Sequence, residues 1–489
     1  MIFVSTRGEE KVQSASAAIA EGLARDGGLF VPESFPDFSG RIEDMLSMDY
    51  YKRAALVIGS YLDEYDKVEL LSACKKAYDK FDGDAAPVVK IDDDLFILEL
   101  FHGPTLAFKD IALTILPYLL RKSADFCGIK EEILVLVATS GDTGKAALEG
   151  FKDAEGIKIN VFYPTGGVSD MQKKQMCSQE GNNVNVVGVK GNFDDCQTAV
   201  KKIFSDPKIN AELKEKGFVL SSANSINFGR LVPQIAYYFS AYCDLVASSE
   251  IKLGDKIDFV VPTGNFGNIL AGYYAKLMGL PVNKLICASN SNNVLTEFFA
   301  TGNYDKNREF FKTVSPSMDI LVSSNLERLI FELSGRDAAL TASRMADLFK
   351  FGSYKITDKE LDLLRNDFGS EYADEEECLA EIQDFFDEYG YVLDTHTAVA
   401  TSVYENVGDK KRPTVVLSTA SFYKFPQSVY FAIKGKKIKD AFNAADALYK
   451  ETAADIPPQI SELKEKPIRF DRIAEKDEVY GAVKDFIGK

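Results

Sequence analysis

The stretch ILVLVATSGDTGKAALEGF, residues 133–151, contains the pattern on which the prediction of the fold depends. It begins with a short apolar run and continues through a glycine-containing turn into a helical segment. The same order recurs in IKINVFYP (157–164) before SDMQKKQM, in VNVVGV (184–189) before FDDCQTAVKKIF, and in DFVVP (258–262) before GNILAGYYAKLMG. Such alternation of strands and helices indicates an α/β protein with a parallel, doubly wound sheet.

The pattern changes on both sides of these units, which suggests a division into domains. Residues 1–94 are mostly helical in pattern, with AIAEGLA, YKRAALVIGSYL and VELLSACKKAYDKF, and we expect an N-terminal helical domain there. A small α/β domain is expected over 131–234, and a large domain over 95–130 and 235–489. Within the latter, 300–390 lacks strong apolar runs and includes the acidic EYADEEEC, so we interpret it as a mostly helical insertion.

Composition excludes several classes of function. The chain has 489 residues, and its 57 Lys and Arg against 74 Asp and Glu give a net charge of −17, which argues against nucleic-acid binding. Two histidines are too few for the usual zinc clusters. The apolar runs are too short to span a membrane, and MIFVSTRGEEK lacks the apolar core of a signal peptide. Seven scattered cysteines without a CxxC pair favour a reducing compartment, and we expect a cytoplasmic protein.

Two loops at predicted strand ends are suited to binding anions. Ligands of open parallel sheets gather at the carboxyl ends of strands. The first loop follows DFVVP at the start of a helix and reads Thr263-Gly264-Asn265-Phe266-Gly267-Asn268. Backbone N–H groups and the helix dipole would favour a phosphate there. A plain tight turn without a ligand is about equally probable for such a short glycine motif. After ILVLVA comes Thr139-Ser140-Gly141-Asp142-Thr143-Gly144, which suits a carboxylate, although a capped helix alone is the commoner explanation.

The segment FHGPTLAFKD (101–110) supplies a candidate nucleophile. Lys109 lies between Phe108 and Ile111, in an apolar setting. Burial lowers the pKa of a lysine and makes its amine a nucleophile and a base, which is what a bond to an aldehyde cofactor requires. A surface lysine that covers apolar neighbours with its stem is the alternative. The two neighbouring anion loops favour the first interpretation.

Taken together, several long motifs carry a resemblance to a known family. FHGPTLAFKD, ATSGDTGKAAL, SSANSINFGRLVPQ, PTGNFGNILAGYYAKLMGLP and the opening STRG…GLARDGGLFVPE occur in this order over nearly the whole chain. This combination resembles threonine synthases of the long bacterial and fungal type. These are pyridoxal 5'-phosphate enzymes of fold type II, with the tryptophan-synthase-β fold. The resemblance implies an α/β fold with two sheet domains, a helical N-terminal unit and the cofactor between the two sheet domains.

The resemblance also implies roles for particular residues. Lys109 matches the lysine that bonds to the cofactor, and Gly264, Asn265, Phe266, Gly267 and Asn268 match the loop that binds the cofactor phosphate. Asp142 falls where the family contacts the 3′-oxygen of the cofactor, and Thr419 resembles the hydroxyl residue facing the pyridine nitrogen. Thr139, Ser140 and Thr143 fall where the substrate carboxylate and phosphate are held, and Ser225 and Arg230 where the substrate phosphate lies.

By resemblance, the reaction converts O-phospho-L-homoserine and water to L-threonine and phosphate, with no nucleic-acid or membrane partner, and a monomer is favoured because the family includes monomers. Ser421-Phe422-Tyr423 depart from the His-Pro-Ala found in many members, so a role for that histidine does not carry over. Three alternatives stay open: a phospho-lyase releasing ammonia and an oxoacid, a serine or threonine dehydratase, and a pyridoxal-phosphate binder without activity.

Overall fold

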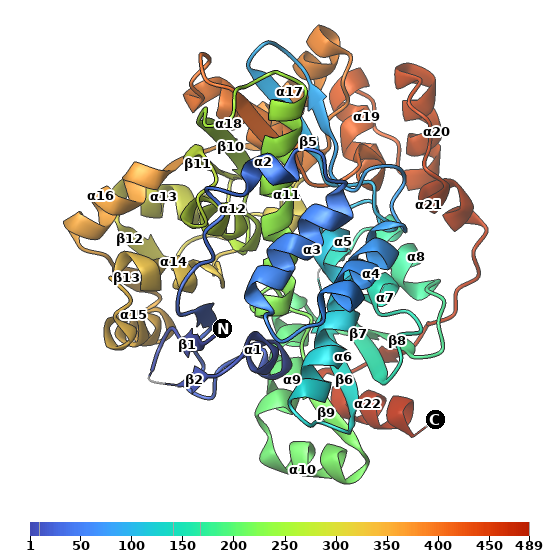
Figure 1. The fold of residues 1–489 in the computed structure, drawn as a ribbon. Coiled ribbons are helices and arrows are strands. Elements are labelled where there is room, and N and C mark those ends of the chain that lie inside the picture. Colours follow the sequence, from blue (N-terminus) through green and yellow to red (C-terminus); the bar gives the residue numbers. More distant parts are fainter. Residues whose placement is uncertain (9, 140, 167, 489) are drawn as a thin grey trace.

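The computed structural model describes residues 1–8, 10–139, 141–166 and 168–488. Two sheets, one in the upper half and one in the lower right of Figure 1, lie on either side of the long helix α11 (Phe228–Ala247). Nearly every residue of α11 is buried, apolar side chains surround it on all sides, and α3 (Tyr50–Tyr61) packs across it. A helix that is apolar all round belongs in a core, which is why α11 can connect the two sheets.

The larger sheet has six strands in the order β14-β11-β10-β15-β5-β4. All neighbouring pairs are parallel except β4 with β5. Its strands, in chain order, are β4 (Val88–Lys90), β5 (Leu95–Glu99), β10 (Ile257–Pro262), β11 (Val282–Ser289), β14 (Phe368–Tyr372) and β15 (Thr414–Ser418).

The smaller sheet has five strands, all parallel, in the order β16-β8-β7-β6-β9. Its strands are β6 (Glu132–Ala138), β7 (Ile157–Pro164), β8 (Val184–Val189), β9 (Phe218–Ser221) and β16 (Ile473–Ala474). The helices of the two sheet layers, up to the middle of the chain, are α5 (Lys109–Leu113), α6 (Leu116–Phe126), α7 (Asp142–Gly150), α8 (Asp170–Cys177), α9 (Phe193–Ser205), α10 (Pro207–Glu215), α12 (Gly267–Leu277) and α13 (Val294–Thr301).

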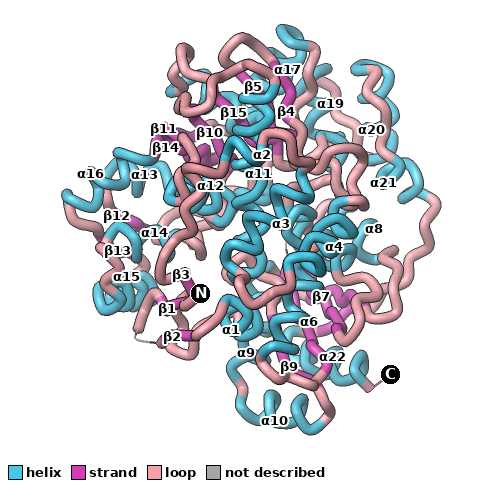
Figure 2. Tube along the Cα trace, in the orientation of Figure 1, coloured by secondary structure: helices cyan, strands magenta, loops and turns pink. Residues whose placement is uncertain are grey.

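Both faces of each sheet are buried, which confirms the predicted doubly wound α/β class. In β10, Phe259 and Val261 point into one core, and Val260 points into another. In β6, Val135 and Leu134 belong to different cores in the same way. Because successive side chains of a strand point to opposite faces, near-continuous apolar strands need helices on both sides. Figure 2 shows the magenta strands enclosed by cyan helices accordingly.

The N-terminal region contains more strand than its pattern predicted. β1 (Phe3–Ser5) pairs antiparallel with β2 (Lys11–Val12) and with β3 (Phe30–Pro32), on either side of the first helix in the chain. The helices here, besides α3, are α1 (Ala15–Glu21), α2 (Ile42–Met45) and α4 (Lys67–Tyr78). Strands of two or three residues are too short to show the period-2 alternation by which a strand is recognised.

The 300–390 segment is mostly helical, as its pattern predicted, but it also contains strands that the sequence did not indicate. It contains β12 (Asn303–Asp305) and β13 (Ser353–Lys355), which pair antiparallel, and β14, which extends the large sheet beside β11. The remaining elements of this segment are η1 (Pro316–Met318), α14 (Leu326–Leu333), α15 (Ala338–Phe351), α16 (Asp358–Asp367) and α17 (Glu375–Tyr389). β14 carries Gly369, Ser370 and Glu371 in its middle, so no apolar run marked it in the sequence.

The C-terminal region also differs from the expected assignment of 235–489 to the large domain. The chain leaves α21 (Pro458–Ser461) and runs down the right side of Figure 1 to the smaller sheet, where β16 pairs with β8 and α22 (Val479–Ile487) packs on its core. The other elements of this region are α18 (Thr395–Val407), η2 (Phe422–Lys424), α19 (Pro426–Lys434), α20 (Ala441–Thr452), η3 (Glu462–Lys464) and η4 (Lys476–Glu478).

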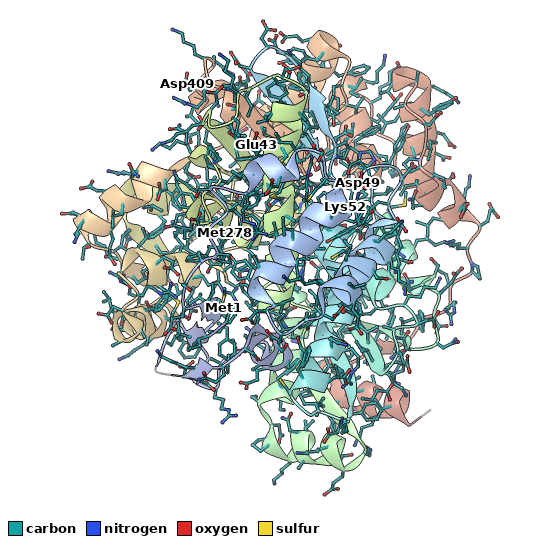
Figure 3. All side chains as sticks on the ribbon, viewed as in Figure 1. Met1, Glu43, Asp49, Lys52, Met278 and Asp409 are labelled. Carbon is teal, nitrogen blue, oxygen red and sulfur yellow. The ribbon has the colours of Figure 1, made fainter. Side chains whose placement is uncertain are left out.

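Many side chains at the outline of the molecule in Figure 3 end in oxygen or nitrogen. The labelled Asp49 and Lys52, at the start of α3, form an exposed ion pair with an N–O distance of 2.8 Å. Within the part of the chain that the structure describes, every helix is too short or too polar to cross a bilayer.

Candidate active site

Most of the predicted site residues follow the ends of four strands, and Ser225 and Arg230 follow a fifth, β9. β5, β10 and β15 of the larger sheet lead into the loops before Lys109, at 263–266 and at Thr419, and β6 of the smaller sheet leads to Thr139. Because the strands are parallel, their carboxyl ends lie along one edge of each sheet. Side chains from both sheets can therefore meet between them.

Backbone pairing fixes the position of Lys109, the first residue of α5. The N–H of Phe108 donates to the carbonyl of Thr419 at 2.9 Å, and the N–H of Ser421 donates to the carbonyl of Leu106 at 3.0 Å. Leu106 itself has a left-handed backbone with φ of 62°, which is unfavourable for a leucine and bends the chain into the helix. Thr419 is thus buried next to the segment that carries Lys109, with its backbone as the contact.

The amine of Lys109 is enclosed and close to a carboxylate. Its Nζ lies 3.8 Å from Oδ2 of Asp142 and 3.5 Å from the hydroxyl of Ser317. Burial lowers the pKa of Lys109 to about 8; Asp142 opposes this shift, while the positive charges of Arg230 and Lys424 add to it. A substantial fraction of this amine is therefore uncharged at a mildly alkaline pH, as a nucleophile or base requires.

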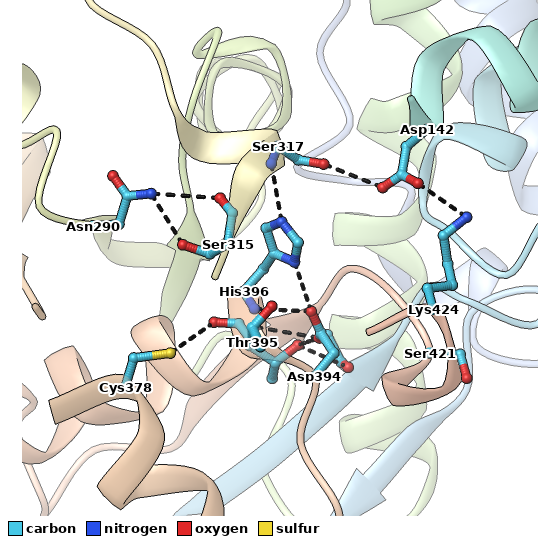
Figure 4. Close-up of polar contacts among 12 residues, drawn as sticks. Asp142, Asn290, Ser315, Ser317, Cys378, Asp394, Thr395, His396, Ser421 and Lys424 are labelled. Carbon is cyan, nitrogen blue, oxygen red and sulfur yellow. Dashed lines mark hydrogen bonds and ion pairs between the residues drawn. The ribbon is translucent and has the colours of Figure 1, made fainter. Parts of the chain in front are cut away.

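Asp142 begins α7 and is held by contacts from three other elements, and Figure 4 shows those with Ser317 and Lys424. Lys424 Nζ lies 3.0 Å from Oδ1, Gln172 Nε2 donates to Oδ1 at 3.2 Å, and the Ser317 hydroxyl donates to Oδ2 at 3.1 Å. Burial alone would raise the pKa of Asp142, but the cations Lys424 and Lys109 hold it well below its ordinary value. The side chain is therefore a permanent carboxylate.

Ser317 was not predicted from the sequence, although it bridges Lys109 and Asp142. Its backbone N–H donates to Nε2 of His396 at 3.1 Å, and Nδ1 of His396 lies 2.8 Å from Asp394 Oδ1 (Figure 4). Because Nε2 accepts this bond, the ring proton is on Nδ1, facing Asp394. His396 therefore positions Ser317, and through it acts on the surroundings of Lys109.

The loop between β10 and α12 forms a cradle of backbone donors. Phe266 has a left-handed backbone with φ of 62°, and none of the N–H groups of residues 264–268 donates to another residue that the structure describes. A Cβ on Gly264 would lie 2.9 Å from the carbonyl oxygen of Ser317, so this position requires glycine. Asn265 is exposed. Free N–H groups at a helix N-terminus are an anion-binding arrangement.

Asn268 adds a side-chain donor to this loop. The hydroxyls of Tyr237 and Tyr238 donate to its Oδ1 at 2.5 and 2.9 Å, which leaves its Nδ2 buried without a partner among the described residues. A buried amide group without a hydrogen bond is costly, and such a group commonly marks the place of a ligand or water.

Arg230 is a buried cation at the start of α11. Its side chain donates to the carbonyl of Ala223 at 2.7 Å, and within the described chain it has no carboxylate within ion-pair distance. Burial lowers the pKa of Arg230 to about 10. Ser225 lies just upstream, and its hydroxyl accepts from Asn325 Nδ2 at 3.1 Å. A buried guanidinium with free donors suits a phosphate or carboxylate.

The threonines of the β6–α7 loop are only partly free to bind a ligand. Thr139 is buried, and its hydroxyl accepts from the N–H groups of Gly141 and Gly144 at 3.0 and 2.8 Å. It therefore binds N–H groups at the start of α7, whose N-cap residue is Gly141, although its own proton can still be donated. Thr143 is half-buried in the first turn of α7. Ser140 lies outside the described residues.

Comparisons with known proteins cover the whole chain. Residues 2–78 match the family described as threonine synthase N terminus, residues 86–419 match pyridoxal-phosphate dependent enzymes, and residues 397–487 match the threonine synthase C-terminal family. Threonine synthase of Pseudomonas aeruginosa is 38% identical over 94% of this chain and 96% of its own length.

A second relative and a solved structure give the same result. Threonine synthase-like 1 of Homo sapiens is 43% identical over 90% of this chain. The match covers 61% of the length of that relative. The crystal structure of pyridoxal-phosphate-bound threonine synthase from Brucella melitensis superimposes with a TM-score of 0.89 at 37% identity, covering 100% of this chain and 98% of that one. The fold, the three matched regions and these relatives agree, and the chain belongs to the threonine synthase family of pyridoxal-phosphate dependent enzymes.

Proposed function

We propose that this protein is a threonine synthase, which converts O-phospho-L-homoserine and water to L-threonine and phosphate. The observation that carries the proposal is the largely enclosed amine of Lys109, 3.8 Å from Asp142, together with the buried Arg230. Lys109 offers an amine for the cofactor, and Arg230 offers a separate cation for a second anion. This combination matches a substrate that carries its own phosphate. The relatives named threonine synthase support the same reaction.

The residues present fit pyridoxal 5'-phosphate. Lys109 would bond to its aldehyde, and the N–H groups of Gly264, Asn265, Phe266 and Gly267 with Nδ2 of Asn268 would hold its phosphate. The buried, unpartnered Nδ2 of Asn268 is the observation that favours a ligand here. When bound, this cofactor supplies an electron-withdrawing system that stabilises negative charge on the carbon next to the substrate amine.

Asp142 and Thr419 complete the proposed cofactor contacts. Asp142 is a permanent carboxylate beside Lys109 and is suited to accept from a hydroxyl group of the cofactor. Thr419 is buried and offers a neutral hydroxyl, which suits the pyridine nitrogen better than a second charge would in this enclosed place.

Lys109 and Arg230 would have the two remaining roles, proton transfer and phosphate binding. The amine of Lys109 is a base near neutral pH because burial lowers its pKa, so it can take a proton from the substrate and return it at a neighbouring carbon. Arg230, with Ser225 and Thr143, would bind the departing phosphate. Thr139 and Ser140 stay proposed contacts of the substrate carboxylate.

The test is incubation with O-phospho-L-homoserine while threonine, phosphate and ammonia are measured together. Equal amounts of threonine and phosphate, without ammonia, are expected. Phosphate with ammonia and an oxoacid would identify a phospho-lyase instead, and ammonia released from serine or threonine would identify a dehydratase. Binding of the cofactor without any product would leave only a pyridoxal-phosphate binder.

The cellular setting is also a proposal. We expect the protein to act in the cytoplasm, because its seven cysteines are free thiols and six of them are buried, as in proteins of reducing compartments. We expect no nucleic-acid partner, because the chain carries a net charge of −17. A monomer is favoured, and sedimentation of the purified protein would test this.

A further inference from the structure

Lys424 is a buried cation that neither the sequence analysis nor the proposed reaction uses. It ends the 3₁₀ helix η2 and is 2% exposed. Its Nζ donates to the carbonyl of Thr105 at 2.8 Å and lies 3.0 Å from Oδ1 of Asp142. Thr105 in turn donates its N–H and hydroxyl to the carboxylate of Asp110, at 2.7 and 2.6 Å.

One ammonium group thus connects three segments around Lys109. Thr105 belongs to the loop that leads into Lys109, Asp142 belongs to α7 of the smaller sheet, and Lys424 follows β15 of the larger sheet. Figure 4 shows Lys424 on one side of Asp142 and Ser317 on the other. Because Lys424 lies closer to Asp142 than Lys109 does, 3.0 Å against 3.8 Å, the main ion pair of this carboxylate is with Lys424.

We propose that Lys424 is a positioning residue: its charge ties Asp142 to the loop before Lys109 and weakens the longer ion pair, at 3.8 Å, between Asp142 and the Lys109 amine, which stays available as a nucleophile. Without Lys424, the uncompensated buried carboxylate would hold the nearest remaining cation, Lys109, in its protonated form. The inference rests on the proposed function only in taking Lys109 as the amine that bonds to the cofactor.

The surroundings of both groups agree with this role. Lys109 is faced by Asp142 from α7, Arg230 from α11, Lys424 from η2 and its neighbour Asp110. Asp142 is faced by Lys424, Lys109, His396 from α18, Gln172 from α8 and Ser317 from η1. Burial lowers the pKa of Lys109, and Lys424 acts in the same direction, whereas Asp142 acts against it. When Lys424 is removed, the effect of Asp142, which raises the pKa of Lys109, is therefore less opposed.

The experiment measures how readily the Lys109 amine reacts as pH is raised. The full-length chain freed of cofactor is labelled with acetic anhydride, and the labelled peptide that contains Lys109 is quantified by mass spectrometry. The rate of pyridoxal-phosphate uptake, followed by absorbance, is measured over the same range. Neither readout uses the substrate, so the result is independent of the reaction catalysed.

For the wild type, the midpoint of labelling is expected at about 8. Lys424→Gln keeps a donor for Thr105 but removes the charge, and should move the midpoint up by about one pH unit, which makes uptake about tenfold slower at neutral pH. Lys424→Arg keeps the charge and should restore the wild-type midpoint. The matched control is Lys276→Met. Lys276 lies on α12 and forms an ion pair with Asp367 at 2.8 Å, and its removal should leave the labelling midpoint and the rate of uptake unchanged.

Two results would overturn the proposal: a wild-type midpoint in Lys424→Gln, or an equal shift in Lys424→Gln and Lys424→Arg, since a purely structural role would make both variants alike. If Lys424→Gln does not fold, the same comparison is made in an Asp142→Asn background, where no buried carboxylate is left unpaired. There the carboxylate through which Lys424 acts is absent, so the loss of the Lys424 charge should hardly move the midpoint, and a shift of about one pH unit would refute the role.

Discussion

Replacing Arg230 with alanine separates binding of the substrate from maintenance of the fold. Arg230 is 5% exposed, and its guanidinium makes one hydrogen bond to the residues that the structure describes, to the carbonyl of Ala223, so most of its five donors have no partner among them. Loss of a preorganised donor to a charged transition state costs about 3 kcal/mol, so kcat/KM for O-phosphohomoserine should fall by roughly 10²-fold. One lost hydrogen bond lowers the free energy of unfolding by only about 1 kcal/mol.

Arg328 provides the matched control, because it is also completely buried but its donors are occupied. It donates to the carbonyls of Phe30 and Ile226, at 3.0 and 2.6 Å, and to Oδ1 of Asn325 at 2.6 Å. Arg328→Ala leaves several buried acceptors without donors, at about 1–3 kcal/mol each, and should destabilise the protein by several kcal/mol.

The assay combines steady-state kinetics, a pyridoxal-phosphate binding titration and urea unfolding of both variants. Arg230→Ala should lose kcat/KM while the cofactor affinity and the unfolding midpoint stay close to those of the wild type. If its kinetics match those of the wild type, or if cofactor affinity falls as far as kcat/KM, Arg230 does not bind the substrate phosphate and the reasoning is wrong.

Three further changes test other parts of the site. Lys109→Ala should abolish turnover and the absorbance band of the bound cofactor, because it removes the amine proposed to bond to the cofactor aldehyde. In the wild type, kcat/KM should rise with pH up to about 8 and then level off, since the uncharged fraction of Lys109 grows until its pKa is passed. Gly264→Ala should weaken cofactor binding by about tenfold or more, because its Cβ would lie 2.9 Å from the Ser317 carbonyl oxygen and displace the cradle.

Each of these has a result that contradicts it. Normal turnover in Lys109→Ala would exclude this residue as the cofactor lysine, and a rate that falls as pH rises toward 8 would mean that the protonated amine is the active form. Gly481→Ala is the control for Gly264→Ala, because nothing lies within 4 Å of a Cβ there. Equal cofactor affinity in the two alanine variants would show that the loop has room for a side chain.

The α/β class could be predicted because long apolar strands repeat before helices. In β6 and β10 both faces are buried, so the sequence shows a continuous apolar run, and the structure confirms the class. β14 could not be predicted, because it lies at the edge of the sheet, where Ser370 and Glu371 are only half-buried. β16 has two residues, too few for any periodicity, and it joins a sheet whose other strands lie far earlier in the chain.

The site was predictable where a motif lies in one loop and less so where contacts join distant segments. Lys109 and the 264–268 loop are marked by local patterns, and their roles stay predictions. Ser317 and Lys424 were not predicted as site residues, because each lies in a short 3₁₀ helix with no glycine pattern. Each contributes to the site through its contact with Asp142, which lies far away in the sequence. To predict such residues, one would need to know which pairs of positions far apart in the chain are in contact.

The pairing of β16 with β8 has a consequence for synthesis on the ribosome. β8 emerges long before β16, so its outer edge, and the apolar surface that α22 later covers, stay open while more than half of the chain is made. At roughly 5–20 residues per second, this interval lasts tens of seconds. An unpaired strand edge is a site for aggregation, so a nascent chain stalled before its last helix is the form in which a chaperone is most needed.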